Sequence, residues 1–146
     1  MAGAGRGPRD LMVDRDLVAT KLGELAEHVA RVRTRRTVSA EDLRRDRDAL
    51  DLVSFNLMLA VQACADVASH VIADEGWPPA TSLGAAFERL RDRSVISGPV
   101  CEALVRAVGL RNVIADGYAG VRPEMVHAAA TTGLADLEAF AREVAS

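Results

Sequence analysis

Apolar residues recur along this chain at intervals of three and four positions, the period of an amphipathic α-helix. Between residues 11 and 33, one such face carries Val18, Leu22, Leu25 and Val29. The basic cluster RVRTRRT at 31–37 ends this first predicted helix. Positive charge at a helix C-terminus complements the helix dipole, which is the structural explanation of the cluster, and contact with RNA phosphate is the functional one.

A second helical pattern follows the sequence SAED at 39–42, in which Ser39 is a suitable N-cap and acidic residues fill the first turn. The pattern runs to about Glu75, with a break indicated near residues 45–48. Its centre, DLVSFNLMLAVQACADVASHVIA, is apolar nearly all round. A helix that is apolar on several sides is buried on several sides, so we expect a central element, packed within a bundle or shared with a partner chain.

The second half of the chain is punctuated by Gly, Pro and Ser. The stretch GWPPATS at 76–82 predicts a loop, after which Thr81 or Ser82 caps a short helix through LGAAFERLRDR, with RLRDRS as a solvated face. SGP at 97–99 starts another helix that stops at Gly117, and RPEMVHAAATTGLADLEAFAREVA forms the last. No strand pattern occurs, so we expect an all-α, compact bundle of about five helices with short loops. This single domain would span 11–146, after a disordered tail at 1–10.

Composition limits what such a bundle can do. Hydrophobic residues make up 49% of the chain but aromatic residues only 3%, so the core must consist of Leu, Val, Ile and Ala. A formal net charge of −3 argues against general binding to polyanions, so contact with nucleic acid would have to be local, and DNA is not an expected partner. The N-terminus lacks the apolar region of a signal peptide, and no uninterrupted apolar run reaches membrane-spanning length. We therefore expect a cytoplasmic protein without membrane contact.

Cysteine and histidine give no sign of a metal site. Cys64 and Cys101 lie on apolar stretches and are expected to be buried free thiols. His28, His70 and His127 fall on separate predicted helices, where structural or solvent-facing roles are expected. Because no cluster of these residues or of carboxylates has the spacing of metal ligands, the sequence predicts no metal and no other cofactor.

The stretch RNVIADGY at 111–118 breaks the apolar pattern of its helix. The stripe that should be buried consists of Val100, Leu104, Ala107 or Val108, position 111 and Ala115. Position 111 is Arg111, and a buried guanidinium is costly unless it is paired or hydrogen-bonded. One interpretation is a structural ion pair with Asp116 or with Asp66 of the central helix. The other is a site for phosphate, with Asn112 either binding phosphate or capping the helix.

Three stretches together resemble one known family. They are NLMLAVQACADVASHVIADEGWPPATSLGAAFERL, GLRNVIADGYAGVRPEMVHAAA and TTGLADLEAFAREV. From about residue 17 onward, the chain is similar to the HepT-type HEPN proteins of bacteria, the toxin halves of HEPN/MNT toxin–antitoxin pairs. The family motif is Arg, four residues, His, any residue, Tyr. Arg111 and Tyr118 match this motif, whereas Asp116 stands in the place of the His.

The resemblance implies a function as well as a fold. It implies a HEPN-like homodimer in which two motifs form a metal-independent endoribonuclease site. The 2′-hydroxyl of RNA would attack the adjacent phosphate, a His would serve as base or acid, and Arg111 would stabilise the charge on phosphorus. Tyr118 would be the residue that a partner nucleotidyltransferase antitoxin, MntA, adenylylates to silence the toxin.

Asp116 puts the activity in doubt. An aspartate is ionised at neutral pH, is a weak base, repels phosphate and can neutralise Arg111. We therefore expect either an attenuated or inactive ribonuclease toxin, or a catalytically silent HEPN dimer that binds an MNT-type nucleotidyltransferase. Asp116 is either the natural residue or a detoxifying substitution, since one nucleotide change converts a His codon into an Asp codon.

Overall fold

The structure is a computed structural model that describes residues 8–36 and 39–146, with side chains from residue 15 onward. The described residues form seven helices and no strand. These are α1 (Pro8–Arg35), α2 (Ala40–Arg45), α3 (Arg47–Asp74), α4 (Leu83–Asp92), α5 (Gly98–Ala115), α6 (Pro123–Ala130) and α7 (Thr132–Ala145). The all-α prediction is confirmed.

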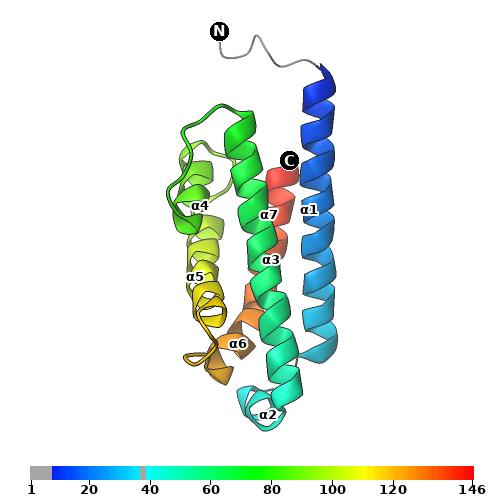
Figure 1. Cartoon of the computed structure of the whole chain (residues 1–146), viewed down its shortest axis with the longest axis vertical. Helices are drawn as coiled ribbons and strands as arrows, with labels where there is room; N and C mark the ends of the chain where they lie inside the picture. The colour runs from blue at the N-terminus through cyan, green and yellow to red at the C-terminus, as the bar shows by residue number, and fades with distance from the viewer. Residues whose placement is uncertain (1–7, 37–38) are drawn as a thin grey trace.

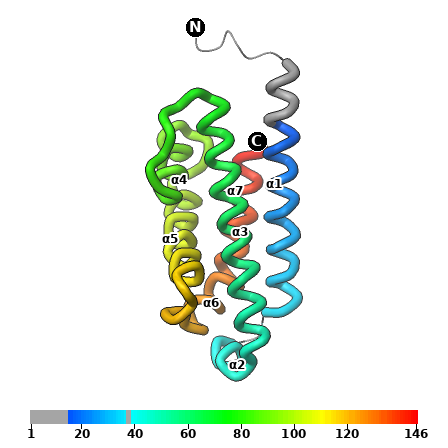
Figure 2. Tube along the Cα trace, in the orientation of Figure 1, coloured from blue at the N-terminus to red at the C-terminus, as the bar shows by residue number. Residues whose placement is uncertain are grey.

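The helices are packed around α3 (Figure 1). On one side α1 lies along α3, and on the other side α4 and α5 cover it, with α7 completing the bundle (Figure 1). Short helices α2 and α6 lie together at one end, which the Cα trace also shows (Figure 2). This arrangement brings the C-terminal end of α5 against the N-terminal half of α3, where the candidate site lies.

The central role predicted for the second helical pattern is confirmed. Helix α3 buries residues on several of its sides, including Ser54 and Ala65 on one side and Ala63 and Val67 on another. By length and composition, α3 is also the one helix of the described residues that could cross a membrane, with a hydropathy of 1.5 in its most apolar window. However, 61% of that window is buried inside the bundle, as expected for a core helix.

Two divisions, one indicated by the sequence and one not, raise the helix number from the expected five to seven. The indicated break near 45–48 is complete: Asp46 ends α2 and caps α3, with its carboxylate accepting a hydrogen bond from the Ala49 amide. The last predicted helix is divided at Thr131, whose hydroxyl donates to the carbonyls of His127 and Ala128. Such side-chain bonds compete with helix continuation.

The predicted ends of the chain are partly corrected. Helix α1 begins at Pro8, three residues before the start expected from the sequence, and residues 1–7 of the expected tail lie outside the described part of the chain. The basic cluster that ends α1 has structural partners, since Arg33 pairs with Glu138 of α7 and Arg36 donates to the Ala130 carbonyl. These contacts favour the structural explanation of the cluster over the RNA-binding one.

Neighbouring residues of α5 allow a direct test of this packing. Leu104 is fully buried, whereas Val105 is 37% exposed. Replacing Leu104 with Ala should lower the free energy of unfolding by about 2–5 kcal/mol, because the cavity left behind adds to the lost burial. The control Val105→Ala should cost less than about 1 kcal/mol. Urea unfolding followed by circular dichroism measures both, and equal losses would contradict this arrangement of α5.

Candidate functional site

Arg111 lies in the last third of α5, on the side that faces α3. One terminal nitrogen of its guanidinium donates to the Asn112 side-chain oxygen at 3.1 Å, and the other donates to the Gln62 side-chain oxygen at 3.0 Å. The Arg111 Nε is buried and has no hydrogen-bond partner. A buried donor without a partner is uncommon and costs free energy, so the position of Arg111 is not explained by stability.

Gln62 connects Arg111 of α5 to Asp66 of α3. Its amide nitrogen donates to the Asp66 carboxylate at 3.2 Å, and the Lys21 ammonium of α1 lies 3.6 Å from the same carboxylate. Three helices therefore orient one guanidinium through a chain of side-chain contacts. Among the described residues, Asp66 is linked to Arg111 through Gln62 and not by direct contact.

The predicted ion pairs of Arg111 are absent. Among the described residues, neither Asp116 nor Asp66 forms a salt bridge with Arg111, whose partners are the neutral amides of Asn112 and Gln62. The structural ion-pair interpretation is therefore wrong for this side chain. Neutral acceptors fix a guanidinium without cancelling its charge, so Arg111 keeps its capacity to bind an anion.

Asp116 is the residue at which α5 ends. Its amide donates to the Asn112 carbonyl at 2.9 Å, while its exposed carboxylate has no hydrogen bond or ion pair among the described residues. The chain then reverses through Gly117 and Tyr118, which both adopt positive φ angles of 109° and 73°. Glycine adopts such angles readily, but tyrosine rarely does.

Tyr118 turns back onto the N-terminal half of α3. Its hydroxyl donates to the Ser54 hydroxyl at 3.1 Å, and the Arg47 guanidinium carbon lies 5.5 Å from the centre of the ring. The side chain is half-buried, and Asp51 lines the same hollow. Burial raises the pKa of the Tyr118 phenol, and the nearby Asp51 carboxylate acts in the same direction.

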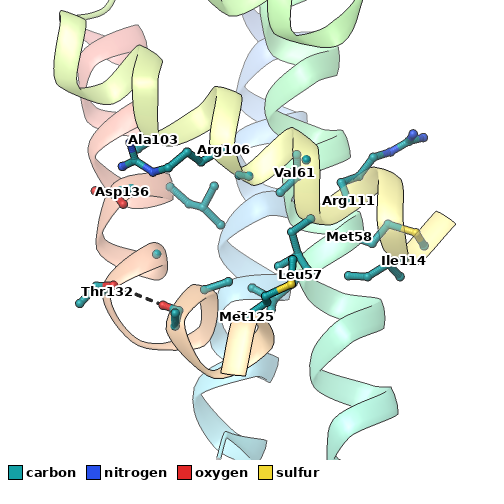
Figure 3. A pocket seen from close by; sticks show the side chains of 17 residues that line it. Leu57, Met58, Val61, Ala103, Arg106, Arg111, Ile114, Met125, Thr132 and Asp136 are labelled. Atoms are coloured by element: carbon teal, nitrogen blue, oxygen red, sulfur yellow. Dashed lines mark hydrogen bonds between the residues drawn. The ribbon is translucent and has the colours of Figure 1, made fainter. Parts of the chain in front are cut away.

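Two hollows meet at this end of the molecule. A cavity of about 420 Å³ between α3, α5, α6 and α7 has Arg111 on its wall (Figure 3). Figure 3 shows the Arg111 guanidinium directed away from this cavity, on the opposite side from Arg106 and Asp136. A second hollow contains Tyr118, and the two share Met58 and Ile114 as a common wall. Arg111 and Tyr118 therefore flank one apolar pair.

Both cysteines and one of the histidines have structural surroundings. Cys64 and Cys101 are buried free thiols, as predicted. His28 is hydrogen-bonded to the buried Asn56 of α3 at 3.0 Å, which joins α1 to the core. Within the described part of the chain, no group of three or more His, Cys, Asp or Glu residues is arranged to hold a metal ion.

The sequence profile of one protein family, described as ribonuclease HepT-like, matches residues 25–144. The chain belongs to the ribonuclease HepT-like family. A curated relative, the mRNA nuclease HepT of Shewanella oneidensis, is 24% identical over 125 residues, which cover 86% of this chain and 93% of the relative. The family expected from the sequence is thus confirmed.

Solved structures show the same fold. A toxin–antitoxin complex with AMP-PNP contains a chain that matches 89% of this protein with a TM-score of 0.83 and 22% identity, over 98% of that chain. The tri-AMPylated HEPN toxin of Shewanella oneidensis, in complex with an MNT antitoxin, matches 89% with a TM-score of 0.82 and 23% identity, over 97% of its length. The bundle of this HepT-like chain is therefore a HEPN fold.

Sequence reasoning missed the residues of α3 that hold the motif in place. Ser54 and Gln62 contact Tyr118 and Arg111 directly, and Arg47 covers the tyrosine ring. A signal was present: these polar residues share a helical spacing with Asp51 and Asp66 along one face of an otherwise apolar helix. Such a row predicts contact with polar side chains of a neighbouring helix.

Tyr118 is the only tyrosine, so its ionisation can be followed by absorbance. We expect the phenol to titrate above the ordinary value of 10.0 in the folded HepT-like chain, because burial disfavours the phenolate, and near that value in urea. Since the folded pKa is the higher one, the contribution of Tyr118 to the free energy of unfolding should be fully present below about pH 10. It should be lost as the pH rises through the folded pKa. Identical titrations in the folded and unfolded chains would disprove the burial of this ring.

Proposed function

We propose that this chain is the toxin of a HEPN/MNT-type toxin–antitoxin pair, with an endoribonuclease site built on Arg111, Asn112, Asp116 and Tyr118. The observation that carries the proposal is the state of Arg111, which lies at the Arg position of the motif and has only neutral partners. A guanidinium oriented in this way can bind the phosphodiester and stabilise the charge that develops on phosphorus.

In the proposed reaction, the 2′-hydroxyl attacks the neighbouring phosphorus while the bond to the 5′-oxygen breaks. A base must take the hydroxyl proton and an acid must protonate the leaving oxygen. Asp116 is a poor substitute for His in both tasks, because an ionised carboxylate is a weak base and carries no proton to donate. We propose that Asp116 makes this form of the enzyme inactive or strongly attenuated.

A second function is favoured by the exposure of Asp116. An exposed carboxylate with no hydrogen bond or ion pair among the described residues is suited to contact with another protein. In this alternative, the chain is a catalytically silent HEPN dimer that binds an MNT-type nucleotidyltransferase. The MNT antitoxin in complex with the HEPN toxin of Shewanella oneidensis supports the same partner class for both functions.

Two further features belong to the proposal. Tyr118 is the proposed site of adenylylation by an MntA-like nucleotidyltransferase, in keeping with the AMPylated state of the Shewanella oneidensis toxin. RNA is the proposed substrate, by analogy with the mRNA nuclease HepT, and the cytoplasm of a bacterium is the proposed location because mRNA is found there. No metal or other cofactor has a part in the proposed chemistry.

The homodimer predicted from the sequence has a candidate surface. Phe55 of α3 is 55% exposed, and Met58, Ile114 and Ala115 lie around the same hollow. An apolar surface beside the motif is suited to a second copy of the chain, which would bring two Arg111 side chains to one site.

Sedimentation at micromolar concentration tests this surface. The unmodified chain should be a dimer, and Phe55→Glu should raise the dimer dissociation constant by about 30-fold or more, as expected for a central aromatic residue of an interface. Leu17→Glu is the control, because Leu17 is an exposed apolar residue of α1, at 37%. If the unmodified chain is monomeric, the dimer proposal is wrong. If Leu17→Glu dissociates it instead, the surface is misplaced.

Residue 116 separates the two functions. Asp116→His restores the missing base and acid, and general acid–base catalysis contributes about 10²–10⁴-fold, so RNA cleavage should become visible on gels. Expression of this variant without an antitoxin should slow bacterial growth.

Two variants control this experiment. Asp116→Asn removes the charge without supplying a base and should remain nearly inactive. Asp116→His combined with Arg111→Ala should lose the gained activity, because no cation then stabilises the phosphorane. A folded, dimeric Asp116→His variant that leaves RNA intact and cells unharmed would exclude the ribonuclease function and favour the binding module.

A further inference from the structure

The Tyr118 hydroxyl is engaged by its own chain. Its acceptor, Ser54, is only 1% exposed, so the hydroxyl is held against the interior face of α3 at 3.1 Å. Arg47 covers the ring from the other direction at 5.5 Å. We call the two contacts of Tyr118, with Ser54 and with Arg47, the Tyr118 anchor.

The backbone next to the anchor is held in an unfavourable conformation. Tyr118 has a φ of 73°, in the left-handed region that is costly for a bulky residue, and it directly follows Gly117 with a φ of 109°. A conformation of this kind persists only where surrounding contacts hold it. In this turn, the Tyr118 carbonyl accepts from the Val121 amide at 3.2 Å, while the anchor holds the side chain.

Adenylylation removes the hydrogen that Tyr118 donates in the anchor. The phenolic oxygen attacks the α-phosphorus of ATP, and a new O–P bond forms as the bond to the pyrophosphate oxygen breaks. Pyrophosphate leaves, and the phenolic proton passes to solvent. The ester oxygen of Tyr118 then has no hydrogen to donate to Ser54. Moreover, the new phosphodiester would carry a negative charge into a hollow beside the buried Ser54, where Arg47 is already paired with the Asp51 carboxylate at 2.9 Å and is not free to pair with it.

We propose that Ser54 is a positioning residue that holds Tyr118 against α3, and that adenylylation releases Tyr118 and its turn from α3. This regulation rests on the proposed function, in which Tyr118 is the modified residue. Because Asp116 and Tyr118 belong to the same turn, release also displaces position 116, the acid–base position of the motif. The modification would thus act on the geometry of the site in addition to covering it.

The anchor can be observed without any partner protein. Tyr118 is the only tyrosine, so ring-¹³C-labelled tyrosine gives signals from this residue alone in NMR spectra of the whole chain. We expect shifts in the unmodified chain that differ from those of free tyrosine, and shifts in Ser54→Ala that move toward them. Ser69→Ala, an exposed serine on the same helix, is the matched control. Unchanged ring signals in a folded Ser54→Ala would overturn the anchor. Should that variant fail to fold, Arg47→Ala tests the same contact from the exposed side.

Adenylylation kinetics then test the regulatory step, with an MNT nucleotidyltransferase and labelled ATP. Tyr118→Phe, which lacks the phenolic oxygen and should take up no label, is the negative control. If the tyrosine must leave α3 before it reacts, Ser54→Ala should lower the KM for the toxin about two- to tenfold, the range for one hydrogen bond, with kcat unchanged. A KM equal to that of Ser69→Ala would overturn the role of Ser54 and leave Tyr118 as the modified residue. Absence of label from every variant would instead overturn the adenylylation proposal, and the regulation with it.

Discussion

The site depends on a single constraint, the placement of the permanent charge of Arg111 between two helices. A guanidinium cannot lose its proton to escape burial, so its donors must find acceptors. Carboxylates would satisfy it most strongly but would also neutralise it. Here the acceptors are the amide oxygens of Asn112 and Gln62, which fix the direction of the group and leave its charge in place. The unpaired Nε is the cost of this arrangement.

Helix α3 supplies the other half of the arrangement through one line of side chains. Arg47, Asp51, Ser54, Met58, Gln62 and Asp66 follow one another at intervals of three and four along the face toward the end of α5. Within this line, Ser54 binds Tyr118, and Gln62, eight residues further on, binds Arg111. Between them, Met58 meets Ile114 and separates the two hollows. The same helix that forms the core therefore sets the spacing of the motif.

Periodicity and capping were sufficient for most of the fold, because they depend on local interactions. Ser39, Ser82 and Ser97 cap helices where the sequence indicated helix starts. The division at Thr131 was missed, because it depends on whether the Thr131 hydroxyl donates to a backbone carbonyl or to solvent. The neutral partners of Arg111 were missed for a related reason: charge pairing is the simplest expectation for a buried cation, and only the packing of α5 on α3 brings Gln62 within reach.

Asp116 is not explained by the fold. It stands at the C-terminal end of α5, where unpaired carbonyls give the helix its negative pole, and the last turn contains no basic residue to compensate. A carboxylate at such a place is unfavourable by about 0.3–1 kcal/mol, whereas a protonated His would be favourable there. The residue is exposed, so packing does not require it either. Since Asp at this position opposes helix stability and is not required by packing, it supports the proposal that residue 116 serves a lowered ribonuclease activity or a contact with a partner.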